Sequence, residues 1–312
     1  MRLAVIDVGT NSVRLDVYQL YKDGHYERLH RAKAMVRLGQ NVFCEKNLHR
    51  EGMKRTLAAL AAFQETCDDL CVDEIRAIAT SAMREAGNGA EFVDAVKKNL
   101  GFDLRVISGK EEAELILEGV RNDARIEEGV FGFIDIGGGS TEVGVCRGAK
   151  TLYLESIPLG ASRLEQMFFQ ENKNGKGVRQ AREHIIEQLS KNRPHKKLPP
   201  IERMLGSSGT VKAVHRMLDK AGKGERIRLK PLTELISELS ALSTEEKCDY
   251  PGMNPQRADI IVPGAVILHE AMIFFRTPNV YFTKFALRDG LLASEIAAVR
   301  HASARKRLKR LK

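Results

Sequence analysis

The sequence predicts an α/β fold that is duplicated into two domains, and three observations support this. The chain has 312 residues, 43% of them hydrophobic, so it is long enough for about two domains with buried cores. Runs typical of strands alternate with amphipathic stretches typical of helices. A β-run, a turn of small residues and a second β-run occur twice, as LAVIDVGTNSVRL from residue 3 and FGFIDIGGGSTEV from residue 131. Two copies of one unit, each opening its own α/β region, indicate two related domains that face each other across a cleft.

The first hundred residues predict a mixed sheet with helices on its faces. Leu3–Ile6 is a continuous apolar run, and a turn at Lys22–Gly24 joins two further strand-like segments. Met53, Leu57 and Leu60 then recur at helical spacing. The expected order is strands at 3–6, 14–20 and 27–38, a helix at 51–70, a strand at 74–79, a helix at 90–100 and a strand at 104–107.

The rest of the chain repeats this alternation. The expected elements are a helix at 110–121, strands at 130–136 and 142–146, helices at 161–171 and 178–192, a strand-like 204–210 leading into a helix at 211–220, and helices at 231–243 and 257–276. A proline-rich connection at 193–200 and loops at 222–230 and 244–256 separate them.

The charge of the chain is unevenly distributed. Seven of the nine net positive charges lie in residues 300–312, which contain no acid, so the rest of the chain is nearly neutral. This basic run is either a solvated helix end or a surface that attracts a polyanion. No apolar stretch approaches the length of a membrane-spanning helix, and Asp7 interrupts the N-terminal apolar segment, so we expect neither a membrane span nor a signal peptide. The odd number of cysteines, five, favours free thiols in the cytoplasm.

The turns of the repeated unit have the chemistry of a phosphate site. Glycines after a strand let backbone N–H groups approach an anion closely, and hydroxyl side chains add donors. Each unit also ends its first strand in an aspartate, Asp7 or Asp135. A carboxylate beside phosphates needs a bridging cation or water, and Mg²⁺ or Mn²⁺ suits a carboxylate with phosphate oxygens and waters. A third Gly/Ser loop follows an apolar strand at Gly206–Thr210.

Six sequence words in this order resemble the Ppx/GppA family of exopolyphosphatases and guanosine pentaphosphate phosphohydrolases. They are IDVGTNSVRL, ATSAMREAGN, VISGKEEAELI, IDIGGGSTEV, IPLGASRL and LGSSGTVKA, and the resemblance extends from residue 3 to about 295. It implies two actin-like (ribonuclease H-like) domains, at 1–120 and 121–295, with the active site in the interdomain cleft. It also implies that a C-terminal helix at about 296–312 packs back on the first domain.

The resemblance implies a role for each motif residue. Glu112 in SGKEEAELI would activate the attacking water, although the alignment leaves Glu111 as the alternative. Asp135, Glu142 and Asp7 would hold the metal ion, with Glu142 also close to the reacting water. The expected phosphate-binding residues are Thr10, Asn11, Ser12, Gly137, Gly138, Gly139, Ser140, Thr141, Gly206, Ser207 and Gly209, and Arg14 and Arg84 are further candidates for contact with a long anionic substrate.

These features predict a hydrolase that releases the terminal phosphate of inorganic polyphosphate, the 5′-terminal phosphate of pppGpp, or both. The sequence does not rank the two substrates. A sugar or acid kinase of the same superfamily and a non-enzymatic, actin-like polyanion-binding protein are the alternatives. No specific nucleic acid and no membrane is expected as a partner, and the resemblance suggests a homodimer.

Overall fold

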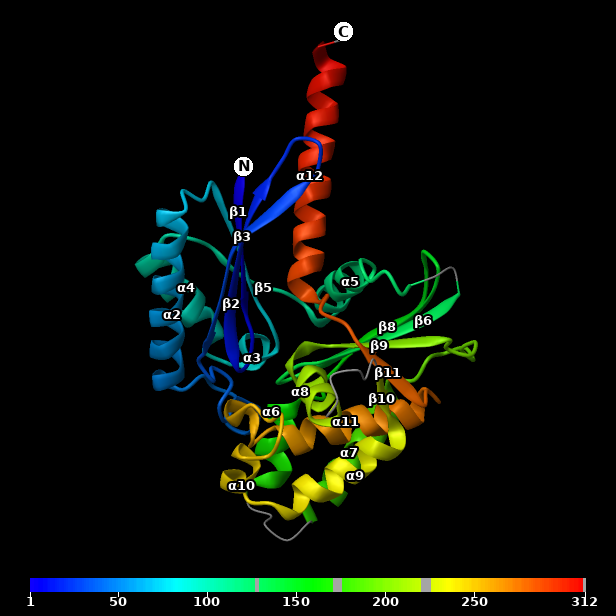
Figure 1. The fold of residues 1–312 in the computed structure, drawn as a ribbon. Coiled ribbons are helices and arrows are strands. Elements are labelled where there is room, and N and C mark those ends of the chain that lie inside the picture. The colour runs from blue at the N-terminus through cyan, green and yellow to red at the C-terminus, as the bar shows by residue number, and fades with distance from the viewer. Residues whose placement is uncertain (127–128, 171–175, 220–225, 311–312) are drawn as a thin grey trace.

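The computed structural model describes the chain except residues 127–128, 171–175, 220–225 and 311–312, and the side chains of 299–312. Its described part contains two twisted sheets (Figure 1). The first sheet has five strands in the order β3-β2-β1-β4-β5. They are β1 (Arg2–Val8), β2 (Ser12–Leu20), β3 (Tyr26–Met35), β4 (Glu74–Ala79) and β5 (Leu104–Val106).

The second sheet repeats the arrangement of the first. Its described strands run in the order β10-β11-β9-β6-β7-β8. They are β6 (Val130–Ile136), β7 (Thr141–Arg147), β8 (Lys150–Ile157), β9 (Arg203–Ser207), β10 (Arg226–Arg228) and β11 (Asn279–Phe282). In both sheets three antiparallel strands are followed by two parallel ones, so β6 to β9 and β11 correspond to β1 to β5. The predicted duplicated α/β fold is confirmed.

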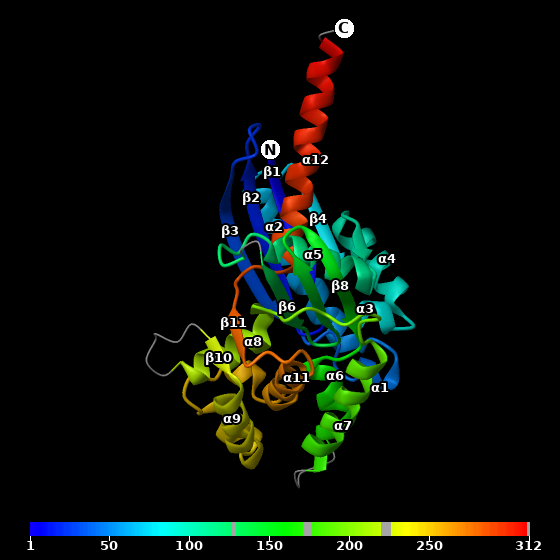
Figure 2. The same cartoon turned by 90° about the vertical axis from the view of Figure 1, so that its right-hand side faces the viewer.

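Helices form layers on both sides of the sheets (Figures 1 and 2). The described helices are α1 (Val42–Glu45), α2 (Arg50–Asp69), α3 (Ser81–Glu85), α4 (Gly89–Leu100), α5 (Gly109–Val120), α6 (Ala161–Leu164) with a π-helical turn at Glu165–Phe169, α7 (Lys176–Lys191), α8 (Ser208–Leu218), α9 (Leu229–Ala241), α10 (Thr244–Cys248), a 3-10 turn at Pro255–Arg257, α11 (Ile261–Phe274) and α12 (Leu287–Arg310). Helices α2 and α4 cover the first sheet, α5 and α12 lie between the sheets, and α7, α8, α9 and α11 cover the second.

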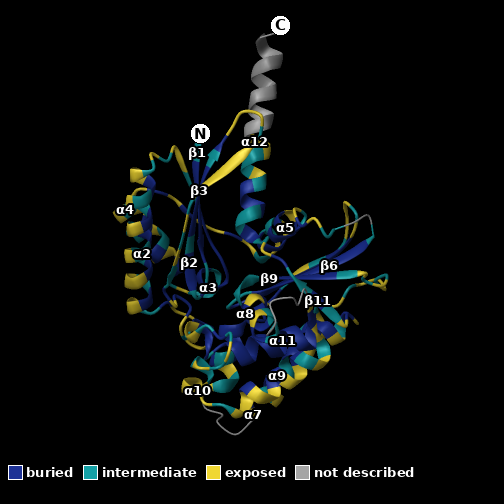
Figure 3. Cartoon of the chain, in the orientation of Figure 1, coloured by how far each residue is buried: buried dark blue, intermediate teal, exposed yellow. Residues whose placement is uncertain are grey.

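The alternation of side chains along β1 explains this layering. Leu3 and Val5 pack in one cluster with side chains of α5 and α12. Ala4, Ile6 and Val8 point to the opposite face and pack with α2 and α4. Helices cover both faces of β1, which is why Leu3–Ile6 is continuously apolar and buried instead of alternating with polar residues (Figure 3).

Some elements were not predicted. The sequence predicts no strand at 147–157 or 276–286, whereas the structure has β8 and β11 there. β8 is an outer strand with mostly polar, partly exposed residues, so its hydrophobic signal is weak. The expected loop at 244–256 contains α10, which begins with a capping box between Ser243 and Glu246.

The domain boundary near residue 120 stays a prediction. Helix α5 contacts β7 and β8 of the second sheet, and α12 contacts both α5 and β1. In α12 the ion pair between Glu295 and Arg76 of β4 spans 2.9 Å. The basic side chains of 300–312 lie outside the described residues. No helix in the described part combines the length and the apolar character needed to cross a membrane.

Candidate active site

A cleft lies where the turns of the two corresponding hairpins meet. It is bordered by the β1–β2 turn, the β6–β7 turn, the start of α8 and the start of α5. The predicted site residues that line it are Asp7, Thr10, Asn11, Ser12, Arg14, Glu112, Asp135, Gly137, Gly138, Gly139, Ser140 and Gly209. The other predicted residues, Thr141, Glu142, Gly206, Ser207 and Arg84, belong to the elements directly behind this lining. The fold therefore brings the predicted motifs to one place.

Two buried carboxylates lie opposite each other in the second hairpin. Asp135 on β6 pairs in register with Glu142 on β7. The Ser207 hydroxyl donates a hydrogen bond to Asp135, and the Ser156 hydroxyl donates one to Glu142 over 2.7 Å. Burial, and then the charge of Asp7, raise the pKa of Asp135 to about 6 despite the hydrogen bond from Ser207. Burial, with the charges of Glu112 and Asp135, raises the pKa of Glu142 well above its ordinary value.

The first hairpin has a different charge arrangement at the equivalent positions. Asp7 on β1 pairs in register with Arg14 on β2, and Arg14 Nη1 lies 3.9 Å from Asp7 Oδ2. Asp7 is buried and Arg14 is half-buried. This hairpin thus brings a cation and a carboxylate to the cleft, where the second hairpin brings two carboxylates.

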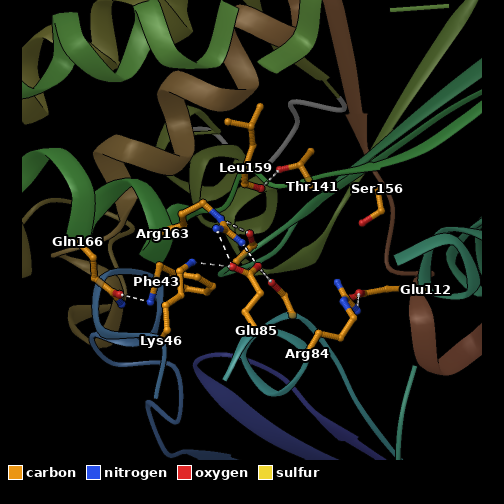
Figure 4. A network of polar contacts seen from close by, with 12 residues as sticks. Phe43, Lys46, Arg84, Glu85, Glu112, Thr141, Ser156, Leu159, Arg163 and Gln166 are labelled. Carbon is orange, nitrogen blue, oxygen red and sulfur yellow. Dashed lines mark hydrogen bonds and ion pairs between the residues drawn. The ribbon is translucent and has the colours of Figure 1, made fainter. Parts of the chain in front are cut away.

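Helix α5 directs Glu112 into the cleft. Ser108 caps its N-terminus by accepting a hydrogen bond from the amide of Glu111 over 3.1 Å. Glu112 is buried and receives a hydrogen bond of 2.7 Å from Arg84 Nη1 (Figure 4). Burial, and in addition the negative charges of Asp7 and Asp135, raise the pKa of Glu112 to about 7, although Arg84 opposes this shift.

Glu111 points to a different neighbour. It is only partly buried and forms a 2.5 Å ion pair with Arg105 of β5. Successive residues of a helix point in clearly different directions. Glu112 faces the cleft, whereas Glu111 faces Arg105 of the first sheet. This placement favours Glu112 over Glu111 as the carboxylate that can reach a molecule in the cleft.

The donor set of the cleft is compatible with a hard cation. Its acidic groups are oxygen donors whose pKa values are raised first by burial and then by neighbouring negative charges, so a cation nearby would relieve an unfavourable concentration of buried charge. In the described part of the chain, no three acidic, histidine or cysteine side chains converge closely enough to hold a metal alone. Waters and substrate oxygens would have to complete its coordination, as is usual for Mg²⁺.

The turns of both hairpins present backbone donors to the cleft. Gly9 N–H donates to Ser12 C=O over 3.1 Å, and Gly137 N–H donates to Ser140 C=O over 2.9 Å, so the two turns have matching geometry. Between these bonds, the amides of Thr10, Asn11, Gly138 and Gly139 have no acceptor among the described residues. Unpaired amides in a concave turn are suited to binding an anion.

The two turns also touch each other. A Cβ on Gly138 would lie 2.6 Å from Cβ of Thr10, so only glycine permits this approach. Asn11 Nδ2 donates to Ser162 Oγ over 2.7 Å, which links the first hairpin to α6. An anion in this cleft would therefore contact both halves of the chain at once.

A polar network lies next to Gly139 of the second turn, and the sequence did not predict its contacts. Arg163 donates to the carbonyl of Gly139 over 2.7 Å and forms a two-point ion pair with Glu85 (Figure 4). Its guanidinium also lies 4.3 Å from the ring centre of Phe43. Gln166 accepts from the amide of Phe43 over 3.1 Å. Arg163 and Glu85 are in two of the recognised sequence words, but nothing in either word indicates that they pair.

Arg257 is a second residue that sequence reasoning missed. It lines the cleft, is only 9% exposed, and no carboxylate in the described part lies within ion-pair distance of it. Burial, and then the charge of Arg14, lower the pKa of Arg257 to about 10. A Cβ on Gly209 would lie 1.9 Å from its guanidinium, so this glycine makes room for the arginine.

Comparisons with known proteins identify relatives of the chain and of its fold. Residues 18–298 match the family model described as the Ppx/GppA phosphatase family. An exopolyphosphatase from Cytophaga hutchinsonii is 26% identical, with 96% of this chain and 98% of that chain covered and a TM-score of 0.86. A Ppx/GppA family member from Aquifex aeolicus is 25% identical, with 96% and 98% covered and a TM-score of 0.77. A structure of nucleoside triphosphate hydrolases from Neospora caninum, 9% identical with 96% and 93% covered and a TM-score of 0.54, shares the fold alone.

Proposed function

Since the chain belongs to the Ppx/GppA phosphatase family, we propose that it is a phosphoanhydride hydrolase that releases the terminal orthophosphate of inorganic polyphosphate, of pppGpp, or of both. The observation that carries this proposal is the position of Glu112. Its buried carboxylate faces two turns with unpaired amides, and its raised pKa is near 7, where a general base is most effective.

The chemical step requires one proton acceptor. A water attacks the terminal phosphorus, Glu112 accepts the proton of that water, and the bond between phosphorus and the bridging oxygen breaks. The bridging oxygen keeps the electron pair and leaves with the shortened chain. Arg84, hydrogen-bonded to Glu112, holds the carboxylate in place and stabilises its charged form.

The turns and Arg257 supply the positive end of the site. The amides of Gly138 and Gly139, with the Thr10 and Ser140 hydroxyls, would bind the oxygens of the terminal phosphate. Arg257 would neutralise the next phosphate, because it is a buried cation with no acidic partner in the described residues.

Asp7, Asp135 and Glu142 would hold Mg²⁺ or Mn²⁺. Asp135 lies at the end of β6, and Glu142 sits behind it with its orientation fixed by Ser156. When bound, the ion would neutralise the charge that develops on the phosphate oxygens. The three carboxylates would balance its charge together with waters and substrate oxygens that complete the coordination.

The test is phosphate release by purified protein, with polyphosphate and pppGpp compared in Mg²⁺ and in excess EDTA. Glu112→Gln should lower kcat by about 10²–10⁴-fold while substrate still binds. Glu111→Gln is the matched control, since it changes the neighbouring carboxylate that pairs with Arg105 outside the cleft, and it should retain kcat within about twofold. Retention of more than half of the wild-type kcat by Glu112→Gln would rule out this base.

A further inference from the structure

The start of α6 holds the carbonyl side of the turn between β6 and β7. Backbone amides there donate to the first two carbonyls of the turn, those of Gly137 and Gly138, over 2.9 to 3.0 Å. The third carbonyl, that of Gly139, accepts a hydrogen bond of 2.7 Å from Nε of Arg163. The Arg163 side chain thus completes a set of three carbonyls that are held from the same segment.

The direction of these carbonyls determines the direction of the amides that follow them. A trans peptide is planar, so its N–H points opposite to its C=O, and the described part of the chain has no cis peptide. The amides of Gly138, Gly139 and Ser140 therefore point away from the groups that hold the carbonyls. None of the three donates to an acceptor among the described residues, and all three residues line the cleft. The bond from Arg163 thus determines where the Ser140 amide points.

The first hairpin holds its turn in a similar way, with backbone groups alone. The carbonyl of Thr10 accepts from the amide of Gly39 over 2.8 Å. The carbonyl of Asn11 accepts from two amides, those of Val36 and Arg37, each over 3.0 Å. These donors follow β3, as α6 follows β8, so the two copies hold their turns from equivalent places. Of the two copies, the second uses a side chain to hold its last carbonyl.

Groups of the first half of the chain fix the guanidinium of Arg163. Its two terminal nitrogens pair with the two carboxylate oxygens of Glu85, and its carbon lies 4.3 Å from the ring centre of Phe43 (Figure 4). Burial raises the pKa of Glu85, but the hydrogen bonds and charges of Arg163 and Lys46 outweigh burial, so this pKa is lowered. Arg163 is only 7% exposed and is not part of the cleft lining. Its donors therefore serve the protein and not a molecule in the cleft.

Helix α3 connects this ion pair to the proposed base. Glu85 directly follows Arg84, whose Nη1 donates to Glu112 over 2.7 Å. One short helix thus holds both the arginine that orients the turn and the carboxylate that would accept the proton. A displacement of α3 would disturb both at once.

We propose that Arg163 is a positioning residue that directs the amide of Ser140 towards an anion in the cleft, and that Glu85 holds its guanidinium in the required orientation. The effect on turnover rests on the proposed hydrolase function, in which this amide would bind an oxygen of the terminal phosphate. A donor that is oriented in advance contributes most where charge develops during the reaction. Arg163 thus acts through the turn, without contact with the substrate.

The experiment compares Arg163→Lys with the control Arg37→Gln. Lysine keeps the charge but lacks the planar fork that reaches a carboxylate and a carbonyl at once. The control breaks another ion pair between the two halves, the 2.7 Å pair with Asp259, and leaves every bond to a turn carbonyl in place. In ¹⁵N-labelled protein, the amide signal of Ser140 is followed as orthophosphate is added at constant Mg²⁺. Phosphate release from tripolyphosphate and the Tm are measured for each variant.

For Arg163→Lys we expect the Kd of orthophosphate, read from the Ser140 signal, to rise about five- to tenfold. The kcat should fall by about ten- to a hundredfold, and by a larger factor than the KM rises. Glu85→Gln should change both quantities in the same direction. The double variant should lose no more than about twofold beyond Arg163→Lys, because both residues act through one turn. Arg37→Gln should stay within about twofold of the wild type.

Three results would overturn the proposal. One is a wild-type Ser140 signal that orthophosphate does not move. Another is an unchanged Kd in Arg163→Lys, whether or not the Tm falls, because Arg163 would then have a structural role alone. The third is a double variant whose losses multiply. If Arg163→Lys does not fold, the Kd measured with Glu85→Gln decides in its place. If the wild type releases no phosphate, the proposed function fails, and the Ser140 titration still decides on the positioning role.

Discussion

Across the β1–β2 hairpin Asp7 lies opposite Arg14, whereas across the corresponding β6–β7 hairpin Asp135 lies opposite Glu142. The two hairpins have the same register and the same hydrogen bond across the turn. Only the charge at one position differs in sign. The two hairpins therefore share a backbone that presents amides to an anion. They differ in the charge at one strand position, which is occupied by Arg14 in the first hairpin and by Glu142 in the second.

The consequence of this difference is electrostatic. The second hairpin buries two carboxylates, and burial, with the charge of Asp7 on Asp135 and the charges of Glu112 and Asp135 on Glu142, raises the pKa of both. Such an arrangement opposes folding at neutral pH unless a cation is present. The first hairpin offers a single carboxylate, Asp7, and keeps the cation of Arg14 beside it, which could contact a substrate phosphate.

Substitution of Glu142 and of Arg14, the two residues that distinguish the hairpins, is the strongest test of their different roles. Glu142→Gln should lower kcat by about 10²–10³-fold, because in the proposed mechanism it removes a charge that would orient the metal ion and the water. Arg14→Gln, at the equivalent position, should mainly raise KM, by about tenfold or less. Steady-state kinetics on polyphosphate at saturating Mg²⁺ separates the two effects. Equal losses of kcat in both variants would mean that the hairpins do not differ in role.

The pH dependence of activity sharpens the contrast, because it depends on the buried acids. As the proposed base, Glu112 would act only when ionised, and burial raises its pKa to about 7, so kcat/KM should increase as the pH rises through about 7 and then level off. Arg84 lowers the pKa of Glu112, so Arg84→Met should move this increase to higher pH by about one unit. Profiles from pH 5 to 9, with Glu111→Gln as control, test this. An unmoved profile would show that Arg84 does not tune the base.

Sequence reasoning found the turns but not the contacts between distant segments. The two hairpins could be predicted because a strand, a glycine turn and a second strand are local patterns. The outer strand β8 has a weak hydrophobic pattern, although its counterpart β3 in the first copy points to it. The pairing of Arg163 with Glu85 depends on how the halves meet, which no local pattern encodes. The same holds for Arg257, whose burial follows from its packing over Gly209.

The stability of the metal-free protein should also distinguish the hairpins, with a smaller effect. Because the folded-state pKa of Glu142 is raised, ionising it disfavours the folded state increasingly as the pH rises from its unfolded value near 4.5. Glu142→Gln should therefore raise the Tm at pH 8 in EDTA by roughly 2–4 °C and lose this advantage near pH 4. Arg14→Gln should lower the Tm, since it leaves buried Asp7 without its cation. Calorimetry at both pH values decides. A lower Tm for Glu142→Gln at pH 8 would show that the ionised carboxylate of Glu142 does not destabilise the folded protein.

The smallest effect is expected from the basic C-terminus. Deleting residues 304–312 removes six basic residues, and if they captured polyphosphate, the KM for long chains would rise and its salt dependence would flatten. Their side chains lie outside the described residues, but Lys33 of β3 and Lys212 and Arg216 of α8 already line a surface that continues from the cleft. We therefore expect the deletion to change the KM for long polyphosphate by less than about twofold. Kinetics with long-chain polyphosphate and tripolyphosphate, together with the Tm of the truncated protein, test this. An increase in the KM for the long chain alone, of about fivefold or more, would assign polyanion capture to the C-terminus. An equal loss on both substrates with a lower Tm would show that the segment stabilises α12.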